Sequence, residues 1–215
     1  MTTLIFEVQD PLSNEFSKKL SELSSLSKLT RIHKPSIPEP EWEWHLTFAG
    51  RYMQHSYYLY NVIDQVMIGN PNISGIVEIG TGYGALTEFL GLWGISRGIP
   101  VVTVDHAIIH DEHVLDSLGV HYLEMDEFSD EFLEYIKDFI ESLDSLLFIC
   151  DGGNKPKEFN LWAPLLKSGS IIAAHDWGTE INWSDIQSTI DTYCTPYAQE
   201  GWNKNGVRFA MFRIN

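Results

Sequence analysis

Two short polar segments hold the residues best suited to chemistry, and each follows an apolar run. Residues 151–155 (DGGNK) come after the run 145–150, and residues 175–177 (HDW) come after the run 170–174. If both runs are strands of one parallel sheet, their polar ends face the same crevice. An imidazole ordinarily exchanges its proton near neutral pH, so we predict His175 as a general base at this crevice.

A dense glycine loop, VEIGTGYGA over residues 77–85, lies where another apolar run should pass into a helix. Glycines there allow a tight turn and a close approach to a ligand beside the positive end of a helix. The loop fits two templates. Its first two glycines with Ala85 match the GxGxx[GA] fingerprint of dinucleotide-binding proteins. Glu78 with all three glycines matches the [DE]xGxGxG loop that binds S-adenosylmethionine.

Charge separates these two templates. A carboxylate at the loop would repel a pyrophosphate and attract the sulfonium and ammonium of S-adenosylmethionine, so Glu78 favours the second. Asp105 lies 21 residues after Gly84, where either cofactor would place a ribose-binding acid. Asp126 follows the third run and is placed to accept from an adenine amino group, or it is a surface acid beside Glu127. We predict cofactor contacts along the loop and after the runs that follow it, at Glu78, Gly80, Thr81, Gly82, Gly84, Asp105, His106, Asp126 and Asp151.

The elements that must position these residues alternate in type, which predicts an α/β fold with a parallel sheet covered on both faces. The apolar runs predict strands at 75–79, 100–104, 120–124, 145–150 and 170–174. Helical patterns lie between and after them, near 84–97, 111–118, 129–142, 156–167 and 184–195. Ser129 is the predicted cap of the third helix, and Ser184 with Gln187 has capping-box spacing in the last.

The end of the chain has a different pattern. Residues 197–202 and 207–214 flank the segment NKNG at 203–206. Because an Asn-Gly pair favours a tight hairpin turn, we predict an antiparallel hairpin here.

The N-terminal zone, residues 1–74, reads as a helical and aromatic-rich addition to a cofactor-binding domain at 75–215. A helix is expected to begin at Asp10-Pro11, and three prolines then mark an extended connector. We interpret the aromatic zone as a substrate lid or dimer contact in which most rings serve packing. Five of its side chains could line an apolar pocket, namely Trp42, Trp44, Tyr52, His55 and Tyr57, and the polar pair Gln54 and His55 is the strongest exception to packing.

Composition bounds the function. The 215 residues carry 14 Lys+Arg against 30 Asp+Glu, a net charge of −16, which argues against a nucleic-acid partner. Two cysteines form no disulfide framework, and Cys150 ends an apolar run as a buried thiol would. The first residues are unlike a signal peptide and no apolar stretch is long enough for a membrane span, so we expect a cytoplasmic protein without membrane contact. A homo-oligomer is left open.

From about residue 73 to the C-terminus, the sequence resembles class I S-adenosylmethionine-dependent methyltransferases. The resemblance rests on VEIGTGYG after the first strand, VTVD after the second, and the closing hairpin. The segments ICDGGNK and AAHDW are most similar to small-molecule O-methyltransferases, including the cephalosporin-hydroxylase-like branch. The resemblance implies a Rossmann-like seven-stranded sheet, mostly parallel with an antiparallel C-terminal hairpin, and methyl transfer from S-adenosylmethionine to a hydroxyl of a small-molecule acceptor.

The same resemblance implies a metal, because related O-methyltransferases place metal-binding carboxylates after these two strands. We therefore predict Asp151, His175 and Asp176 as ligands of Mg²⁺ or another divalent cation. The histidine departs from the usual oxygen ligands. Catechol-type relatives use a lysine three residues after the metal aspartate as the base; here that position is Asn154, which leaves Lys155 as a rival to His175 or as a solvated lysine at a helix start.

Two other functions stay open at this point. The dinucleotide fingerprint fits an NAD-dependent oxidoreductase, and a non-catalytic relative could keep the sheet and lack the chemistry. Titration with S-adenosylmethionine and with NAD would distinguish a methyltransferase from an oxidoreductase.

Overall fold

The computed structural model of the chain describes residues 47–48, 51–56, 58–107, 112–203 and 206–215. Its main feature is a seven-stranded sheet with the order β5-β4-β3-β6-β7-β9-β8. The strands are β3 (Gly75–Ile79), β4 (Val101–Asp105), β5 (Val120–Glu124), β6 (Leu146–Cys150), β7 (Ile171–Ala174), β8 (Cys194–Tyr197) and β9 (Ala210–Ile214). The first five are parallel and β9 runs antiparallel to both β7 and β8, so the predicted sheet is confirmed.

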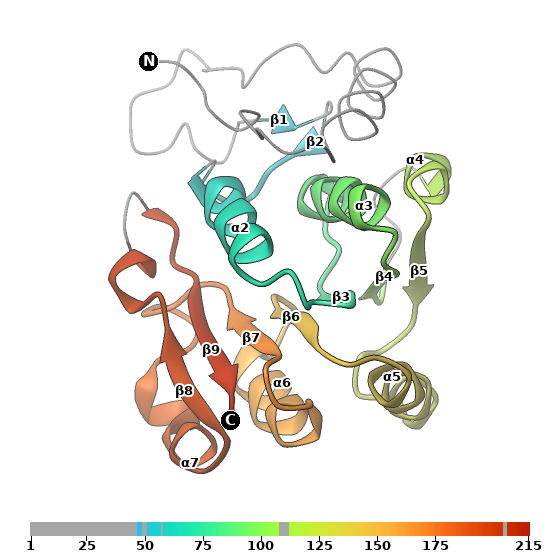
Figure 1. Cartoon of the computed structure of the whole chain (residues 1–215). Coiled ribbons are helices and arrows are strands. Elements are labelled where there is room, and N and C mark those ends of the chain that lie inside the picture. Colours follow the sequence, from blue (N-terminus) through green and yellow to red (C-terminus); the bar gives the residue numbers. More distant parts are fainter. Residues whose placement is uncertain (1–46, 49–50, 57, 108–111, 204–205) are drawn as a thin grey trace.

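Helices cover both faces of this sheet. They are α2 (Tyr58–Gly69), α3 (Ala85–Arg97), α4 (Glu112–Ser117), α5 (Asp130–Ser142), α6 (Lys155–Trp162) and α7 (Trp183–Tyr193), with short 3-10 turns at Ala163–Leu165 and Gln199–Gly201. Figure 1 shows α2, α3 and α4 on one side of the sheet and α5, α6 and α7 on the other. The central strands β3 and β6 read GIVEI and LLFIC and are buried along their whole length, as expected where both faces of a sheet are covered.

Local sequence signals predict the start of α5 correctly and the capping box of α7 incorrectly. Ser129 caps α5 by accepting from the Phe132 N–H, as predicted. The capping box of α7 is formed by Asn182 and Asp185, so the Ser184 and Gln187 prediction is wrong. Asn182 adopts the extended backbone that a cap needs, whereas Ser184 already lies inside the helix.

The C-terminal hairpin exists, but its strands begin elsewhere than predicted. Tyr197 pairs with Met211, and a 3-10 turn lies in the long connection between β8 and β9. The predicted strand 197–202 is therefore wrong, because only Tyr197 of that range belongs to β8 and Trp202 packs its ring against Phe212 instead. Part of the Asn-Gly segment lies outside the described residues.

The described part of the N-terminal zone packs on α3. The short strands β1 (Thr47–Phe48) and β2 (Arg51–Tyr52) pair antiparallel, and Phe48 and Tyr60 place their rings 5.8 and 4.8 Å from that of Phe89. These rings share one core with the sheet, which supports the packing interpretation for them. The helix expected at Asp10-Pro11, the side chain of Tyr52, and the residues Trp42, Trp44 and Tyr57 lie outside what the structure describes. The division into domains at residue 74 stays a prediction.

Two further expectations concern the chain as a whole. Cys150 and Cys194 are both buried and free, which agrees with the absence of a disulfide framework. Among the described residues, no helix combines the length and the apolarity needed to cross a membrane.

Candidate active site

A cavity of about 300 Å³ opens at the carboxyl ends of the parallel strands. This is the position where open α/β sheets bind ligands, between the loops that follow neighbouring strands. Its walls come from the segment before α2, the glycine loop, and the ends of β4, β6 and β7. The lining residues are Gln54, His55, Gly80, Thr81, Gly82, Val104, Asp105, His106, Glu127, Asp151, Gly152, Gly153, Lys155, His175 and Asp176.

The glycine loop forms one wall because its backbone can turn sharply. Gly80, Gly82 and Gly84 all have positive φ, and Gly84 caps the start of α3 in the left-handed conformation. A Cβ at Gly80 would lie 2.3 Å from the Asp151 carbonyl oxygen, so only glycine lets the loop approach the end of β6. Thr81 lies deeper and its hydroxyl is 2.7 Å from that of Thr103 on β4.

Asp105 holds the loop from the neighbouring strand. Its Oδ2 accepts a hydrogen bond of 2.9 Å from the Gly82 N–H, and its side chain is only 14% exposed. His106 lies beside it at the mouth of the cavity, where its ring is largely exposed. A carboxylate has further lone pairs, so Asp105 can still accept from a ligand hydroxyl as predicted.

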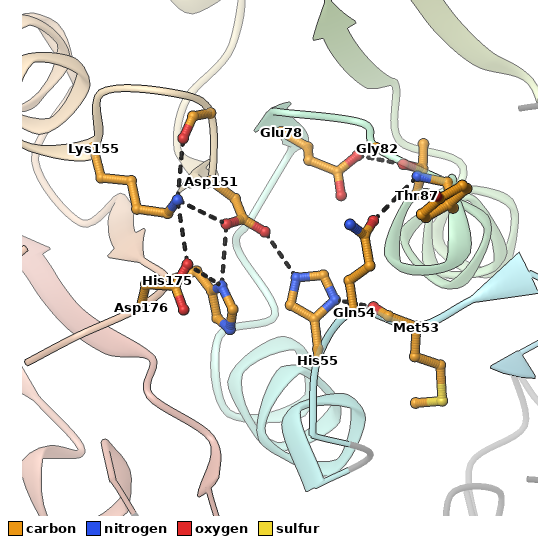
Figure 2. Close-up of polar contacts among 12 residues, drawn as sticks. Met53, Gln54, His55, Glu78, Gly82, Thr87, Asp151, Lys155, His175 and Asp176 are labelled. Carbon is orange, nitrogen blue, oxygen red and sulfur yellow. Dashed lines mark hydrogen bonds and ion pairs between the residues drawn. The ribbon is translucent and has the colours of Figure 1, made fainter. Parts of the chain in front are cut away.

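Glu78 does not occupy the place that the charge argument gave it. It is 1% exposed and lies beneath the loop, where its Oε2 accepts from Thr87 at 2.5 Å (Figure 2) and from Thr103 at 2.7 Å. Burial raises the pKa of Glu78 to about 8, although these two hydrogen bonds act to lower it. The side chain is thus mostly uncharged at neutral pH and is absent from the cavity lining, so it organises the loop from below.

Asp126 also lies away from the cavity. It is exposed and accepts from the Phe128 N–H at 2.8 Å, which closes a local turn before α5. The neighbouring Glu127 lines the cavity in its place. The predicted adenine contact of Asp126 is therefore unsupported, because sequence pattern alone could not tell which of two adjacent acids points inward.

Gln54 is a lining residue that enters from the N-terminal zone. Its Oε1 accepts from the Tyr83 N–H at 3.3 Å, so it contacts the glycine loop directly (Figure 2). Its φ of 54° is unusual for a residue with a Cβ, and Asp176 across the cavity has a φ of 56°. Such left-handed residues concentrate at functional sites, where the surrounding structure holds them.

Asp151 contacts the side chains of His55, Lys155 and His175. Its Oδ2 accepts from His55 Nε2 at 2.7 Å, and its Oδ1 accepts from His175 Nδ1 at 3.1 Å (Figure 2). The other nitrogen of His55 donates to the Met53 carbonyl, so that ring is fixed from both sides. Burial alone would raise the pKa of Asp151, but the two imidazoles hold it well below its ordinary value.

His175 at the end of β7 lies between two carboxylates. Its Nδ1 is 3.1 Å from Asp151 Oδ1 and 3.4 Å from Asp176 Oδ2, and its Nε2 points away from both (Figure 2). Burial alone would lower the pKa of His175, but these carboxylates raise it to about 9. The ring is therefore mostly protonated at neutral pH, whereas the sequence prediction assumed an ordinary imidazole.

Lys155 is neither solvated nor placed as a base. Its side chain is 6% exposed, and its Nζ lies 2.8 Å from Glu180 Oε2, 3.3 Å from Asp176 Oδ2 and 3.5 Å from Asp151 Oδ1. Burial alone would lower the pKa of this ammonium, but the three carboxylates raise it above its ordinary value. An ammonium held this way does not take up a proton, which removes Lys155 as a candidate base.

The predicted metal ligands converge, but not as an oxygen-lined Mg²⁺ site. Asp151, His175 and Asp176 lie side by side, and the space between the two carboxylates faces the Lys155 ammonium. Mg²⁺ prefers oxygen ligands and would meet this positive charge, so the three residues do not fit it. A different set, His55, Asp151 and His175, brings one ligand atom each within 4.8 Å of the others and has the imidazole-rich character that transition metals accept.

The cavity carries a negative lining. Four carboxylates face it, from Asp105, Glu127, Asp151 and Asp176, and Lys155 is the one lysine or arginine among the described residues that line it. Such a lining attracts cationic ligand groups and opposes a pyrophosphate. The predicted acidic crevice is thus present with Glu127 as a member and without Glu78 and Asp126.

No family model and no curated protein matches the sequence. Solved structures do match the fold. CmcI in a form with Mg and SAM has a TM-score of 0.60 at 14% identity, with 94% of this chain and 100% of that chain covered. CalS11, a TDP-rhamnose 3'-O-methyltransferase of calicheamicin biosynthesis, has a TM-score of 0.52 at 16% identity, with 99% of each chain covered.

A third match is the methyltransferase MycE of the mycinamycin biosynthetic pathway, in complex with Mg and SAH. Its TM-score is 0.52 at 15% identity, and 92% of this chain matches about half of that one, 55%. At these identities the comparisons establish architecture. The chain therefore has the seven-stranded fold of class I S-adenosylmethionine-dependent methyltransferases.

Proposed function

We propose that the protein is an S-adenosylmethionine-dependent methyltransferase that acts on a hydroxyl oxygen of a small molecule. The observation that carries this proposal is the acidic cavity beside the glycine loop, at the ligand-binding edge of a sheet whose solved neighbours include methyltransferases. The negative lining suits the sulfonium and ammonium of this cofactor. It opposes the pyrophosphate of NAD, which makes the oxidoreductase alternative the weaker one.

The residues around the loop suit such a cofactor. Gly80 and Gly82 leave the backbone bare of side chains, and Asp105 offers a carboxylate for ribose hydroxyls beside them. Thr81 and His106 complete this side of the cavity. Gly84 is absent from the lining and contributes as the cap of α3.

S-adenosylmethionine supplies a methyl group on a sulfonium, which is electrophilic without further activation. The chain's task is then to orient the acceptor oxygen and remove its proton. We propose that His175 Nε2 accepts the proton of the acceptor hydroxyl, because the Nδ1 of this ring faces Asp151 and Asp176. Asp151 keeps the ring oriented and stabilises its protonated form, and His55 fixes Asp151 from the opposite side.

The acceptor is proposed to be a small molecule because CalS11 and MycE act in the biosynthesis of calicheamicin and mycinamycin. The net charge of −16 supports the absence of a nucleic-acid partner. The cytoplasmic location and any homo-oligomer stay predictions from the sequence.

Calorimetric titration tests the cofactor half of the proposal. We expect saturable one-to-one binding of S-adenosylmethionine and S-adenosylhomocysteine and no binding of NAD. Tight NAD binding without binding of either methyl-cycle ligand would refute the proposal.

Transfer of a labelled methyl group to a panel of hydroxyl-bearing acceptors tests the catalytic half. Removing a general base costs about 10²–10⁴-fold in rate, and we expect a loss of this size for His175→Ala with unchanged affinity for S-adenosylhomocysteine. Full activity of that variant would exclude His175 as the base and leave the cofactor assignment standing.

A further inference from the structure

The Lys155 ammonium has the surroundings of a bound cation. Four oxygens lie within 3.5 Å of its Nζ, from the Gly152 carbonyl and the carboxylates of Asp151, Asp176 and Glu180 (Figure 2 labels Asp151 and Asp176). They come from the ends of two neighbouring strands, β6 and β7, and the loops that follow. Such a convergence of oxygens on one positive charge is the arrangement expected of a cation site.

The fold fixes this ammonium in place. Lys155 is the first residue of α6, whose start is capped by the Asn154 side chain. The buried carboxylate of Glu158, one turn later, accepts from the N–H groups of Gly152 and Asn154 at 3.2 and 2.9 Å. The loop and the helix start are therefore held together, which restricts the position of the Lys155 side chain.

The charges around the Lys155 ammonium disfavour binding of a second cation beside it. The side chains of Asp151 and Asp176 are 12% and 17% exposed, and both turn an oxygen toward the ammonium. Asp151 also accepts from His55 and His175. A divalent ion between the carboxylates would lie against the ammonium at close range, where little water screens the repulsion.

We infer that Lys155 is this protein's own cation at the position between Asp151 and Asp176, and that the pair binds no Mg²⁺ or Mn²⁺ while the lysine is present. CmcI and MycE, which share the fold, have been solved with Mg. In this chain the ammonium balances the carboxylates and positions Asp151 against His175. The inference concerns cation binding, so it stands or falls independently of methyl transfer.

Removing the lysine should create a site for a divalent ion. Lys155→Ala removes the ammonium that three carboxylates share, those of Asp151, Asp176 and Glu180. Lys155→Gln keeps most of the side-chain volume and an N–H donor, and serves if the alanine variant fails to fold. Lys157→Ala is the matched control, because Lys157 lies on the same helix but is exposed and stacks on Phe128.

The probes are Mn²⁺, followed by its electron paramagnetic resonance spectrum, and Mg²⁺, followed by thermal unfolding of EDTA-treated protein. We expect no saturable Mn²⁺ binding by the unaltered protein or Lys157→Ala, and one-to-one binding by a Lys155 variant. Mg²⁺ at one hundred times its dissociation constant should raise the melting temperature of that variant by about 5–10 °C and leave the unaltered protein unchanged.

Two results would overturn the inference. One is one-to-one binding of Mg²⁺ or Mn²⁺ by the unaltered protein that persists in His55→Ala, a variant that removes a ligand of the separate set His55, Asp151 and His175; it would show that the ammonium does not take the ion's place. The other is a folded Lys155 variant that binds neither ion, which would show that these oxygens are not a cation site.

Discussion

At the scale of single residues, one carboxylate organises the candidate active site. Asp151 accepts hydrogen bonds from His55 and His175 with different oxygens and forms an ion pair with Lys155. Three positive or proton-bearing groups thus share one mostly buried acid, which keeps it ionised. The consequence for chemistry is a histidine whose proton is held more tightly than usual.

The protonation of His175 is the most direct expectation at this scale. Its pKa of about 9 means that the ring is protonated at pH 7 and loses its proton as the pH rises through 9. Titration of the ring by nuclear magnetic resonance, assigned with His175→Ala, checks this. Because only the deprotonated ring accepts a proton, the methyl-transfer rate should rise about tenfold per pH unit below pH 9. A ring that titrates below pH 7 would contradict the assignment of Asp151 and Asp176 as its partners.

Asp105 offers a paired test with Asp126. Loss of charged hydrogen bonds costs about 1–3 kcal/mol, so Asp105→Ala should weaken S-adenosylhomocysteine binding about 5- to 150-fold. Asp126→Ala removes an exposed acid outside the cavity and should leave the affinity unchanged. Calorimetry on both variants measures the difference. Equal affinities for the two would mean that Asp105 does not touch the ligand.

At the scale of elements, the glycine loop and the α2–α3 packing position the site. The loop approaches β6 because its first glycine has no side chain, and α3 begins at its last glycine. Helix α2 is joined to α3 by a buried hydrogen bond of 2.9 Å from Trp93 Nε1 to Asp64 Oδ1.

Gly80→Ala should disrupt the loop. The new Cβ would meet the Asp151 carbonyl at 2.3 Å, and alanine strains the backbone at a φ of 89°. We expect a loss of about 2 kcal/mol or more in the free energy of unfolding, measured by urea denaturation. Gly201→Ala is the control, since nothing lies within 4 Å of its Cβ and its backbone is ordinary. Equal stability of the two variants would show that the loop relaxes without cost.

Asp64→Asn should change how stability depends on pH. Burial raises the pKa of Asp64 to about 7, despite the lowering effect of the Trp93 hydrogen bond. The folded protein therefore binds this proton more tightly than the unfolded chain, and stability falls as the pH rises from about 4 to about 7. Asparagine keeps an acceptor for Trp93 and has no proton to lose.

We expect Asp64→Asn to match the unaltered protein near pH 4 and to exceed its free energy of unfolding by about 2–4 kcal/mol at pH 8. Urea denaturation across this range measures it, and Asp138→Asn, at an exposed position of α5, is the control. A constant difference between the two curves at all pH values would contradict the burial effect.

At the scale of the whole molecule, the surplus of acids sets the long-range electrostatics. A net charge of −16 on 215 residues opposes the compact state through self-repulsion. Inside the cavity, the same excess is balanced locally by Lys155 and the protonated His175. Repulsion between acids at the surface is weakened by salt.

The melting temperature should therefore rise with ionic strength. The screening length falls from about 30 Å at 0.01 M salt to about 8 Å at 0.15 M, which weakens the repulsion between surface acids. We expect an increase of a few degrees between these two NaCl concentrations, measured by calorimetry with EDTA present. A melting temperature that stays constant or falls would mean that surface repulsion contributes little to stability.

The sequence by itself determined the sheet and the edge at which the site lies. The strands β4 and β6 are short and mostly apolar, and the acids at their ends, Asp105 and Asp151, are placed by their own strands. The glycines at positions 80, 82 and 84 likewise predict a local turn. These features depend on residues close together in the chain, so pattern and spacing suffice to find them.

The tertiary structure decided which of these groups meet and what charge they carry. His55 reaches Asp151 across 96 positions, and Lys155 reaches Glu180 across 25, contacts that no local pattern encodes. Glu78 matched its motif, yet burial under the loop leaves it mostly uncharged at neutral pH. Charge state depends on burial and on partners from other strands, which is why the roles of Glu78, Lys155 and His175 could be read only from the folded chain.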